Sequence, residues 1–85
     1  MNYSCYIIYS KILDRYYIGE TEDLLLRLIQ HNSGFFKGCY TSKSSDWIPF
    51  HVIECETKEQ ARKIENHIKR MKSRKYIEDL KKYPE

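Results

Sequence analysis

The sequence predicts an α+β fold, in which a small three-stranded antiparallel sheet is flanked by helices in the order ββαβαα. Two observations support this prediction. Residues 4–10 and 15–20 are rich in tyrosine and isoleucine and are separated by a short polar break, which is typical of a β-hairpin. Later segments carry apolar residues at helical spacing, and each follows a residue that can cap a helix.

The length and composition are those of a small folded protein. At 85 residues the chain is expected to form a single domain over 1–85, and its 41% hydrophobic content argues against disorder. It contains no run of about 20 apolar residues, so no membrane association is expected, and no secretory signal is visible. Three cysteines without a CxxC pair indicate reduced thiols and a cytoplasmic location.

The predicted hairpin presents large side chains on both of its faces. In its first strand, Tyr9 shares a face with Cys5 and Ile7. In its second strand, Tyr17 shares a face with Gly19, whose missing side chain allows another group to approach the backbone closely. The register decides whether Tyr9 and Tyr17 lie together, and the alternation is compatible with a shared face.

The next segment predicts a helix that is capped by Thr21, runs to about Asn32 and stops at the following Ser-Gly pair. Its predicted apolar stripe consists of Leu25, Leu28 and Ile29. A neighbouring face of the same helix carries Leu24, Arg27 and His31.

The remaining elements are a loop, a strand and two helices. Residues 35–46 are rich in Gly, Ser, Lys and Thr and are expected to form an exposed loop. Residues 47–55 alternate as a third strand, which Trp47 is expected to anchor in the core. The capping box 57–60 starts a second helix, and a third is expected over 73–83.

One acidic residue does not suit its place in the second helix. Glu65 lies at the margin of the apolar stripe, where a carboxylate is costly unless it is paired, hydrogen-bonded or bound to a cation. A salt bridge to Lys69, one turn later, would satisfy it without any functional role. A metal ion is the alternative partner.

The positive charge of the chain is concentrated in its C-terminal third. The net charge is +3, but residues 57–82 contain ten basic and four acidic residues, which gives that segment +6. Such a distribution is typical of a protein that binds a polyanion, although a solvated helix surface can produce it too. The candidates for contacts to nucleic acid are Lys63, Lys69, Arg70, Lys72, Arg74 and Lys75.

An ordered set of motifs along nearly the whole chain resembles the GIY-YIG endonuclease family, and in particular its small stand-alone bacterial members. The chain is also similar to the catalytic domain of excision-repair and homing endonucleases. Ile7 stands where the first signature usually has glycine. The matching segments are Ile7-Ile8-Tyr9, Tyr17-Ile18-Gly19, Glu20-Thr21, Asp23-Leu24, Arg27-Leu28, His31-Asn32-Ser33-Gly34, Glu59-Gln60-Ala61 and Ile64-Glu65.

The resemblance implies a DNA endonuclease that nicks one strand with low sequence specificity and uses one divalent metal ion, Mg²⁺ or Mn²⁺. It implies that Tyr9 is the base or orients the water, that Tyr17 positions the phosphate or the water, and that Arg27 binds the phosphate. It further implies that Glu65 is the metal ligand. His31 would assist the tyrosine or the water, although a histidine in the last turn of a helix also suits the helix dipole.

The substrate and the role of partners stay open at this stage. Branched or damaged DNA in repair and a protein partner that targets the enzyme are both compatible with the sequence. The alternative to an independent nuclease is a non-catalytic or partner-dependent nucleic-acid-binding module of the same fold.

Overall fold

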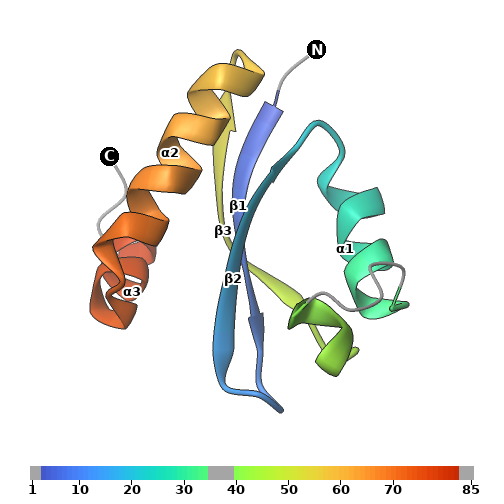
Figure 1. The fold of residues 1–85 in the computed structure, drawn as a ribbon. Coiled ribbons are helices and arrows are strands. Elements are labelled where there is room, and N and C mark those ends of the chain that lie inside the picture. The colour runs from blue at the N-terminus through green and yellow to red at the C-terminus, as the bar shows by residue number, and fades with distance from the viewer. Residues whose placement is uncertain (1–2, 35–39, 83–85) are drawn as a thin grey trace.

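The computed structural model describes residues 3–34 and 40–82, and it confirms the predicted fold class. Strand β1 (Tyr3–Ser10) pairs antiparallel with β2 (Arg15–Thr21) and with β3 (Ile48–Cys55), which gives the sheet order β2-β1-β3. The helices are α1 (Leu24–Asn32), α2 (Lys58–Met71) and α3 (Arg74–Lys82), together with the 3₁₀ turn η1 (Tyr40–Lys43). Figure 1 shows α1 and η1 on one side of the sheet and α2 and α3 on the other.

Three of the sequence-based expectations concern residues outside the described ranges. They are the first part of the predicted loop (35–39), the thiol of Cys39 and the end of the third helix at Tyr83. Within the described ranges, Cys5 and Cys55 are buried free thiols, and no helix has the length and apolar character needed to cross a membrane.

The sheet separates two hydrophobic clusters. On the α1 side, Tyr6, Ile8 and Trp47 are buried and contact Leu24 and Leu28. On the other side, the buried residues from β1, α2 and α3 are Cys5, Ile7, Ile68 and Ile77. Because β1 is the central strand, its alternating side chains contribute to both clusters.

Trp47 is 1% exposed and its indole Nε1 donates to the main-chain oxygen of Thr41 at 2.9 Å, which confirms its predicted role as a core anchor.

We expect Trp47→Ala to lower the free energy of unfolding by about 3–5 kcal/mol, because it leaves a large cavity and an unpaired carbonyl. Urea denaturation measures this loss. Ile12→Ala is the control, since Ile12 is 76% exposed and its truncation should change stability by less than about 0.5 kcal/mol. Equal losses in the two variants would contradict the prediction.

The inward face of α1 differs from the predicted apolar stripe. Leu24 and Leu28 face the core together with the buried His31, whereas Leu25 and Ile29 are 71% and 56% exposed. The helix is capped by Asp23, whose Oδ1 accepts a hydrogen bond from the main-chain nitrogen of Leu26, and not by Thr21. The apolar pattern is misleading here because the inward face carries a polar imidazole among its leucines.

Candidate active site

A buried tyrosine and a glycine face each other at the edge of the sheet. Tyr6 of β1 is paired with Gly19 of β2 and is 1% exposed. A Cβ atom added to Gly19 would lie 2.5 Å from the Tyr6 phenol oxygen and 2.6 Å from its Cζ. The absence of a side chain at position 19 therefore makes room for the phenol of Tyr6.

The phenol of Tyr6 is hydrogen-bonded to an imidazole from the helix that covers it. Its oxygen lies 2.9 Å from His31 Nε2, and His31 Nδ1 lies 2.8 Å from Thr41 Oγ1 in η1. The ring of Tyr17 packs edge-on against the same imidazole, with 5.1 Å between the ring centroids. His31 is 2% exposed, so it is part of a buried polar network and more than a residue that complements the helix dipole.

Burial determines the charge states of these two groups. Burial, and to a smaller extent the positive charge of Arg27, lower the pKa of His31 to about 4. Burial also raises the pKa of Tyr6, with a further contribution from Tyr17, while Arg27 opposes this shift. At neutral pH the imidazole is therefore neutral and the phenol is protonated. The two hydrogen bonds then allow the Tyr6 hydroxyl to donate to His31 Nε2, while His31 Nδ1–H donates to Thr41 Oγ1.

The structure does not bring Tyr9 to this cluster, so the expectation that Tyr9 and Tyr17 share a face is wrong. Tyr17 is paired with Ile8, whereas Tyr9 is paired with Tyr16, and neighbouring residues of a strand point to opposite faces. The Tyr9 hydroxyl donates to Asp14 Oδ1 at 2.6 Å, and its ring packs 4.9 Å from that of Tyr16. Sequence reasoning missed Tyr6, which the register places beside Gly19.

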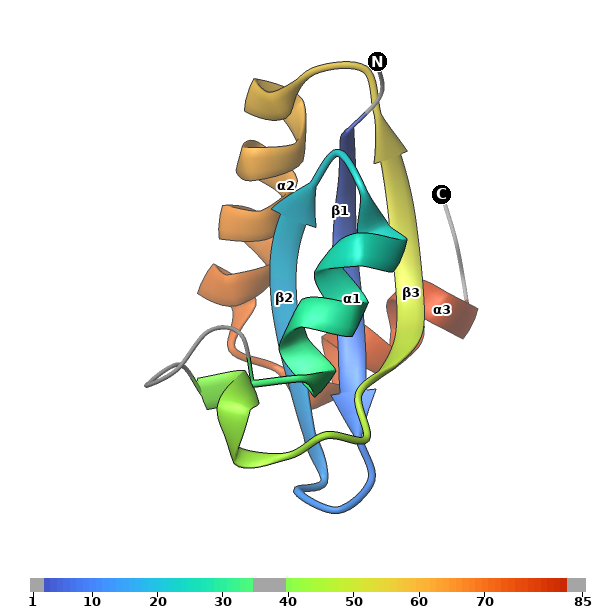
Figure 2. The same ribbon diagram turned by 90° about the vertical axis from the view of Figure 1, so that its right-hand side faces the viewer.

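Two opposite charges from different helices act on Tyr6. Arg27 extends from α1 and Glu65 from α2, and these helices lie on opposite faces of the sheet (Figure 1). The negative charge of Glu65 raises the pKa of the Tyr6 phenol, whereas the guanidinium of Arg27 lowers it. Figure 2 shows β2 as an edge strand, and the site is built around this edge.

Glu65 has the surroundings of a cation ligand. Its side chain is 15% exposed, and its Oε2 lies 2.6 Å from Lys69 Nζ, which is the salt bridge that the sequence predicts. On the same side of the sheet, Glu20 is paired with Cys5, and both Glu20 and Glu65 raise the pKa of the Cys5 thiol. The buried Oε2 of Glu20 has no hydrogen-bond partner.

These carboxylates fit a hard divalent cation such as Mg²⁺ or Mn²⁺, which prefers oxygen ligands and keeps several waters. Lys69 now supplies the positive charge beside Glu65, and the unpartnered oxygen of Glu20 is a second hard donor nearby in the same layer. Within residues 3–34 and 40–82, no group of three or more His, Cys, Asp or Glu side chains could enclose a metal. A cation bound here would therefore have few protein ligands, and the candidate donors are the carboxylates of Glu65 and Glu20.

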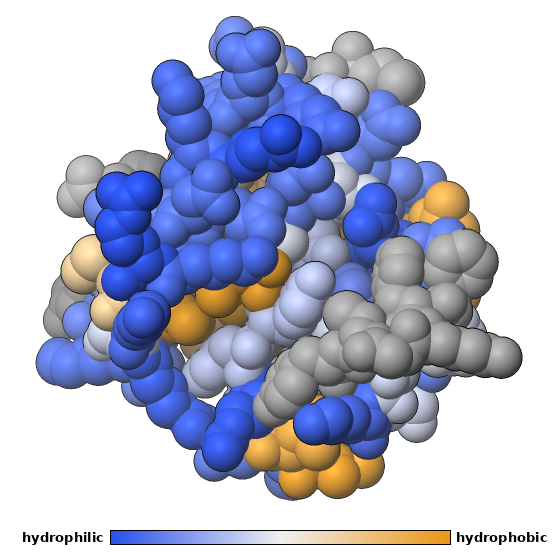
Figure 3. All heavy atoms as spheres, viewed as in Figure 1, coloured by the Kyte–Doolittle hydropathy of each residue, from blue (hydrophilic) through white to orange (hydrophobic). Residues whose placement is uncertain are grey.

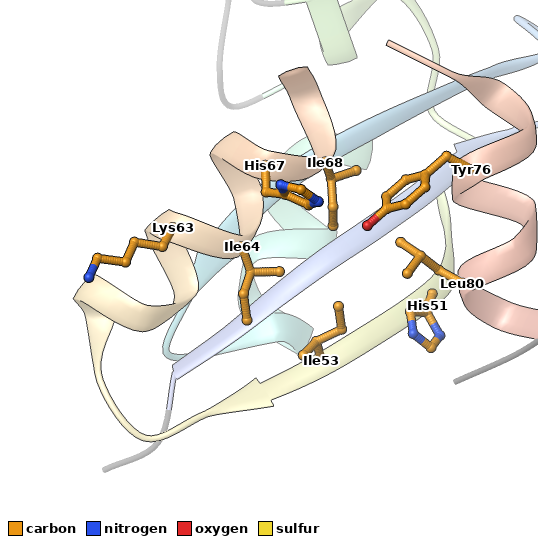
Figure 4. Close-up of a pocket in the computed structure, with 8 residues that line it drawn as sticks. All are labelled: His51, Ile53, Lys63, Ile64, His67, Ile68, Tyr76 and Leu80. Carbon is orange, nitrogen blue, oxygen red and sulfur yellow. The ribbon is translucent and has the colours of Figure 1, made fainter. Parts of the chain in front are cut away.

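The basic residues that the sequence singled out divide between different surfaces. A groove of about 400 Å³ between β2 and the α2–α3 junction is lined by Lys69, Lys72 and Arg74, and also by Arg15, which sequence reasoning missed. Lys63 lies at the rim of a different pocket, of about 370 Å³, and points away from it (Figure 4).

The other two basic residues that the sequence predicts as contacts to nucleic acid do not line the groove. Lys75 is 83% exposed and pairs with Asp79 at 3.6 Å, and Arg70 is exposed on α2. The structure therefore groups only half of the predicted nucleic-acid contacts at one place.

Comparison with known proteins finds similarity to a family model and to a solved structure. The family model of the GIY-YIG catalytic domain matches residues 2–77. The chain is similar to the solution NMR structure of the UPF0213 protein of Bacillus halodurans, with 30% sequence identity and a TM-score of 0.57. The similarity covers 94% of this chain and 82% of that chain. No curated protein matches the sequence.

Proposed function

The chain belongs to the GIY-YIG family of nuclease catalytic domains, and from this premise we propose that it is a metal-dependent DNA endonuclease that nicks one strand with low sequence specificity. The observation that carries the proposal is the buried hydrogen bond between the Tyr6 phenol and His31, together with the opposite effects of Arg27 and Glu65 on the pKa of that phenol. Phosphodiester hydrolysis needs a proton acceptor for water, a cation for the phosphate and a ligand for a metal ion. These side chains offer each of the three.

Tyr6 and His31 form the proton path. Water attacks phosphorus and the P–O bond to the leaving oxygen breaks, which leaves the negative charge on that oxygen. The proton of the water passes to the Tyr6 oxygen as Tyr6 gives its own proton to His31 Nε2 at 2.9 Å. The imidazole can accept this proton because burial keeps it neutral at working pH. Tyr17, which is half-buried against the same imidazole, orients the phosphate or the water. Tyr6 thus takes the role that the sequence assigned to Tyr9.

Arg27 and Glu65 act on the charge of the phosphate. The guanidinium of Arg27 presents a planar set of donors to two phosphate oxygens, which a lysine would not reproduce. Glu65 would hold the divalent cation, which when bound stabilises negative charge on the phosphoryl and leaving oxygens. The ammonium group of Lys69, which contacts Glu65 Oε2 at 2.6 Å, would compete with the cation for this carboxylate.

Nicking of supercoiled plasmid in Mg²⁺ or Mn²⁺ tests this function. We expect the wild type to nick the plasmid and Glu65→Ala and Arg27→Ala to lose the activity. Nicking that is equal in all three proteins would come from a contaminant and would contradict the proposal. Salt-sensitive DNA binding without any cutting would favour the non-catalytic module, and cutting only after addition of cell extract would favour the partner-dependent one.

The buried imidazole predicts how stability depends on pH. The pKa of His31 is about 4 in the folded protein against 6.5 for an ordinary histidine. Between these values the unfolded chain binds a proton that the folded chain excludes, so stability falls as the pH is lowered. We expect the free energy of unfolding to decrease by up to about 3 kcal/mol from pH 6.5 to pH 4. Urea denaturation at several pH values measures this change, and His31→Gln should largely abolish it. An equally steep decrease in His31→Gln would show that other groups cause it.

A further inference from the structure

The groove between β2 and the α2–α3 junction has the composition of a nucleotide site. Its volume of about 400 Å³ lies within the range of small-molecule sites. Ile18, Ile68 and Ile77 contribute apolar side chains to it. Figure 3 shows apolar surface, in orange, between the hydrophilic side chains of α2 and α3 and the paler surface along β2.

The positive charge around the groove exceeds what the protein neutralises. Four of the lining residues are basic, and of these Arg74 is paired with Asp14 and Lys69 with Glu65. The Arg15 guanidinium donates to the main-chain oxygen of Asp14. Within the described part of the chain, no ion pair or side-chain hydrogen bond involves Lys72. An anionic ligand would therefore find positive charge that is not already neutralised.

The backbone is unfavourable at two positions of this same groove. Asp14 has a φ of 53° and Lys72 has a φ of 48°, and they are the only residues other than glycine with positive φ in the described ranges. Lys72 is the C-cap of α2, where glycine is the residue that best fits a left-handed backbone. A left-handed backbone is costly for lysine, and a ligand bound by the Lys72 ammonium group would give a reason for a lysine at this position.

The groove adjoins Glu65 of the proposed active site through Lys69. Lys69 lines it, and the ammonium group of Lys69 contacts Glu65 Oε2 at 2.6 Å. A DNA strand whose scissile phosphate lies at Arg27 and Glu65 can therefore continue along β2 into this groove. There, basic side chains meet the backbone and isoleucines meet a sugar or a base.

We propose that this groove binds the nucleotide next to the scissile phosphate on the strand that is cut, and that Arg15 and Lys72 contact its backbone phosphate. This inference rests on the proposed function for the identity of the ligand. It adds a binding site on the α2–α3 side of β2, whose lining does not include Tyr6, Tyr17 or the imidazole of His31.

The test is the binding of a fluorescent single-stranded oligodeoxynucleotide, measured by anisotropy at several salt concentrations without metal. The Arg15→Gln/Lys72→Gly double variant removes both charges, and glycine suits the backbone at position 72. The matched control is Arg62→Gln/Lys58→Ala, which removes two exposed charges near the start of α2, outside the groove.

We expect the groove variant to bind about tenfold or more weakly, and the slope of log K against log salt to decrease in magnitude by about 1.4, or about 0.7 for each lost phosphate contact. The control should keep a slope close to that of the wild type. Equal behaviour of the two double variants, or no binding by the wild type, would overturn the inference. Thermal melting of the groove variant shows whether it is folded.

The binding assay distinguishes this inference from the proposed function. A wild type that binds the oligonucleotide with the expected difference between variants, but does not nick plasmid, would leave the groove in place and refute the nuclease. A wild type that nicks plasmid while both double variants bind equally would refute the groove alone.

Discussion

Tyr6→Phe is expected to nick supercoiled plasmid about 10²- to 10⁴-fold more slowly than the wild type, whereas Tyr9→Phe should stay close to the wild-type rate. Each substitution removes one hydroxyl group and keeps the ring. Only the hydroxyl of Tyr6 contacts His31, and only it is acted on by both Arg27 and Glu65. The Tyr9 hydroxyl contacts Asp14 on the other face of the sheet. Initial rates of nicking at saturating metal measure the difference.

Tyr6→Phe and Tyr9→Phe remove the same chemical group, and the free energy of unfolding of each variant provides the control. Loss of the hydrogen bond from Tyr9 to Asp14 should lower the free energy of unfolding by no more than about 0.5–1.5 kcal/mol. Tyr6→Phe leaves the buried His31 without one partner, so its unfolding must be checked at the assay temperature. A folded Tyr6→Phe at full rate, combined with a slow Tyr9→Phe, would refute the assignment of the proton path to Tyr6.

Gly19→Ala is expected to have the second largest effect, a loss of nicking of about a hundredfold or more together with about 1–3 kcal/mol of stability. The new Cβ would lie 2.5 Å from the Tyr6 oxygen, so the phenol has to move. Any such movement disturbs the 2.9 Å contact to His31. Because Gly19 does not have a positive φ, the cause is steric and not backbone strain. Nicking rates and urea denaturation of the same preparation separate the two losses.

Gly34→Ala is the matched control for this substitution. Gly34 has a φ of 75°, and no atom of the described residues lies within 4 Å of an added Cβ, so alanine there brings backbone strain without a clash with them. It should lose stability, by about 1 kcal/mol, and keep its nicking rate. If Gly34→Ala lost nicking as severely as Gly19→Ala, loss of stability would explain both results, and the steric account would fail.

The fold could be predicted because its local signals agree with one another. The tyrosine-rich hairpin, the capping residues Thr57 and Ser73 and the apolar spacing of α2 are all used in the structure as the sequence indicates. These features depend on neighbours within a few residues, which a sequence displays directly.

The identity of the first site tyrosine depends on the register, and there the prediction failed. The polar break over 11–14 pairs Ser10 with Arg15, and counting back from that pair places Tyr6 opposite Gly19. The signal was therefore present in the length of the turn. The motif Ile7-Ile8-Tyr9 resembles the expected signature, but Tyr6 lies three residues earlier, and an odd number of residues along a strand places a side chain on the other face of the sheet.

The Glu65 pattern allowed two interpretations, of which the structure shows the salt bridge, while the metal ligand stays a prediction. The salt bridge to Lys69 follows from their spacing on one helix. The effect of Glu65 on Tyr6 depends on packing between α2 and the sheet, which no local pattern reveals. The same reason explains why Arg15 was missed, because it joins the basic groove only through the contact of the hairpin with α3.

The central claim is that Glu65 of α2 and Tyr6 of the central strand β1 border a single cation-dependent site near Gly19. Broadening of backbone amide signals in NMR spectra, as Mn²⁺ is added without DNA, tests this claim most directly. We expect the signals of Gly19, Glu20 and Glu65 to broaden first and Glu65→Gln to abolish the effect. Broadening that starts at Asp14 or elsewhere, with Gly19 unaffected, or that persists in Glu65→Gln, would contradict the account.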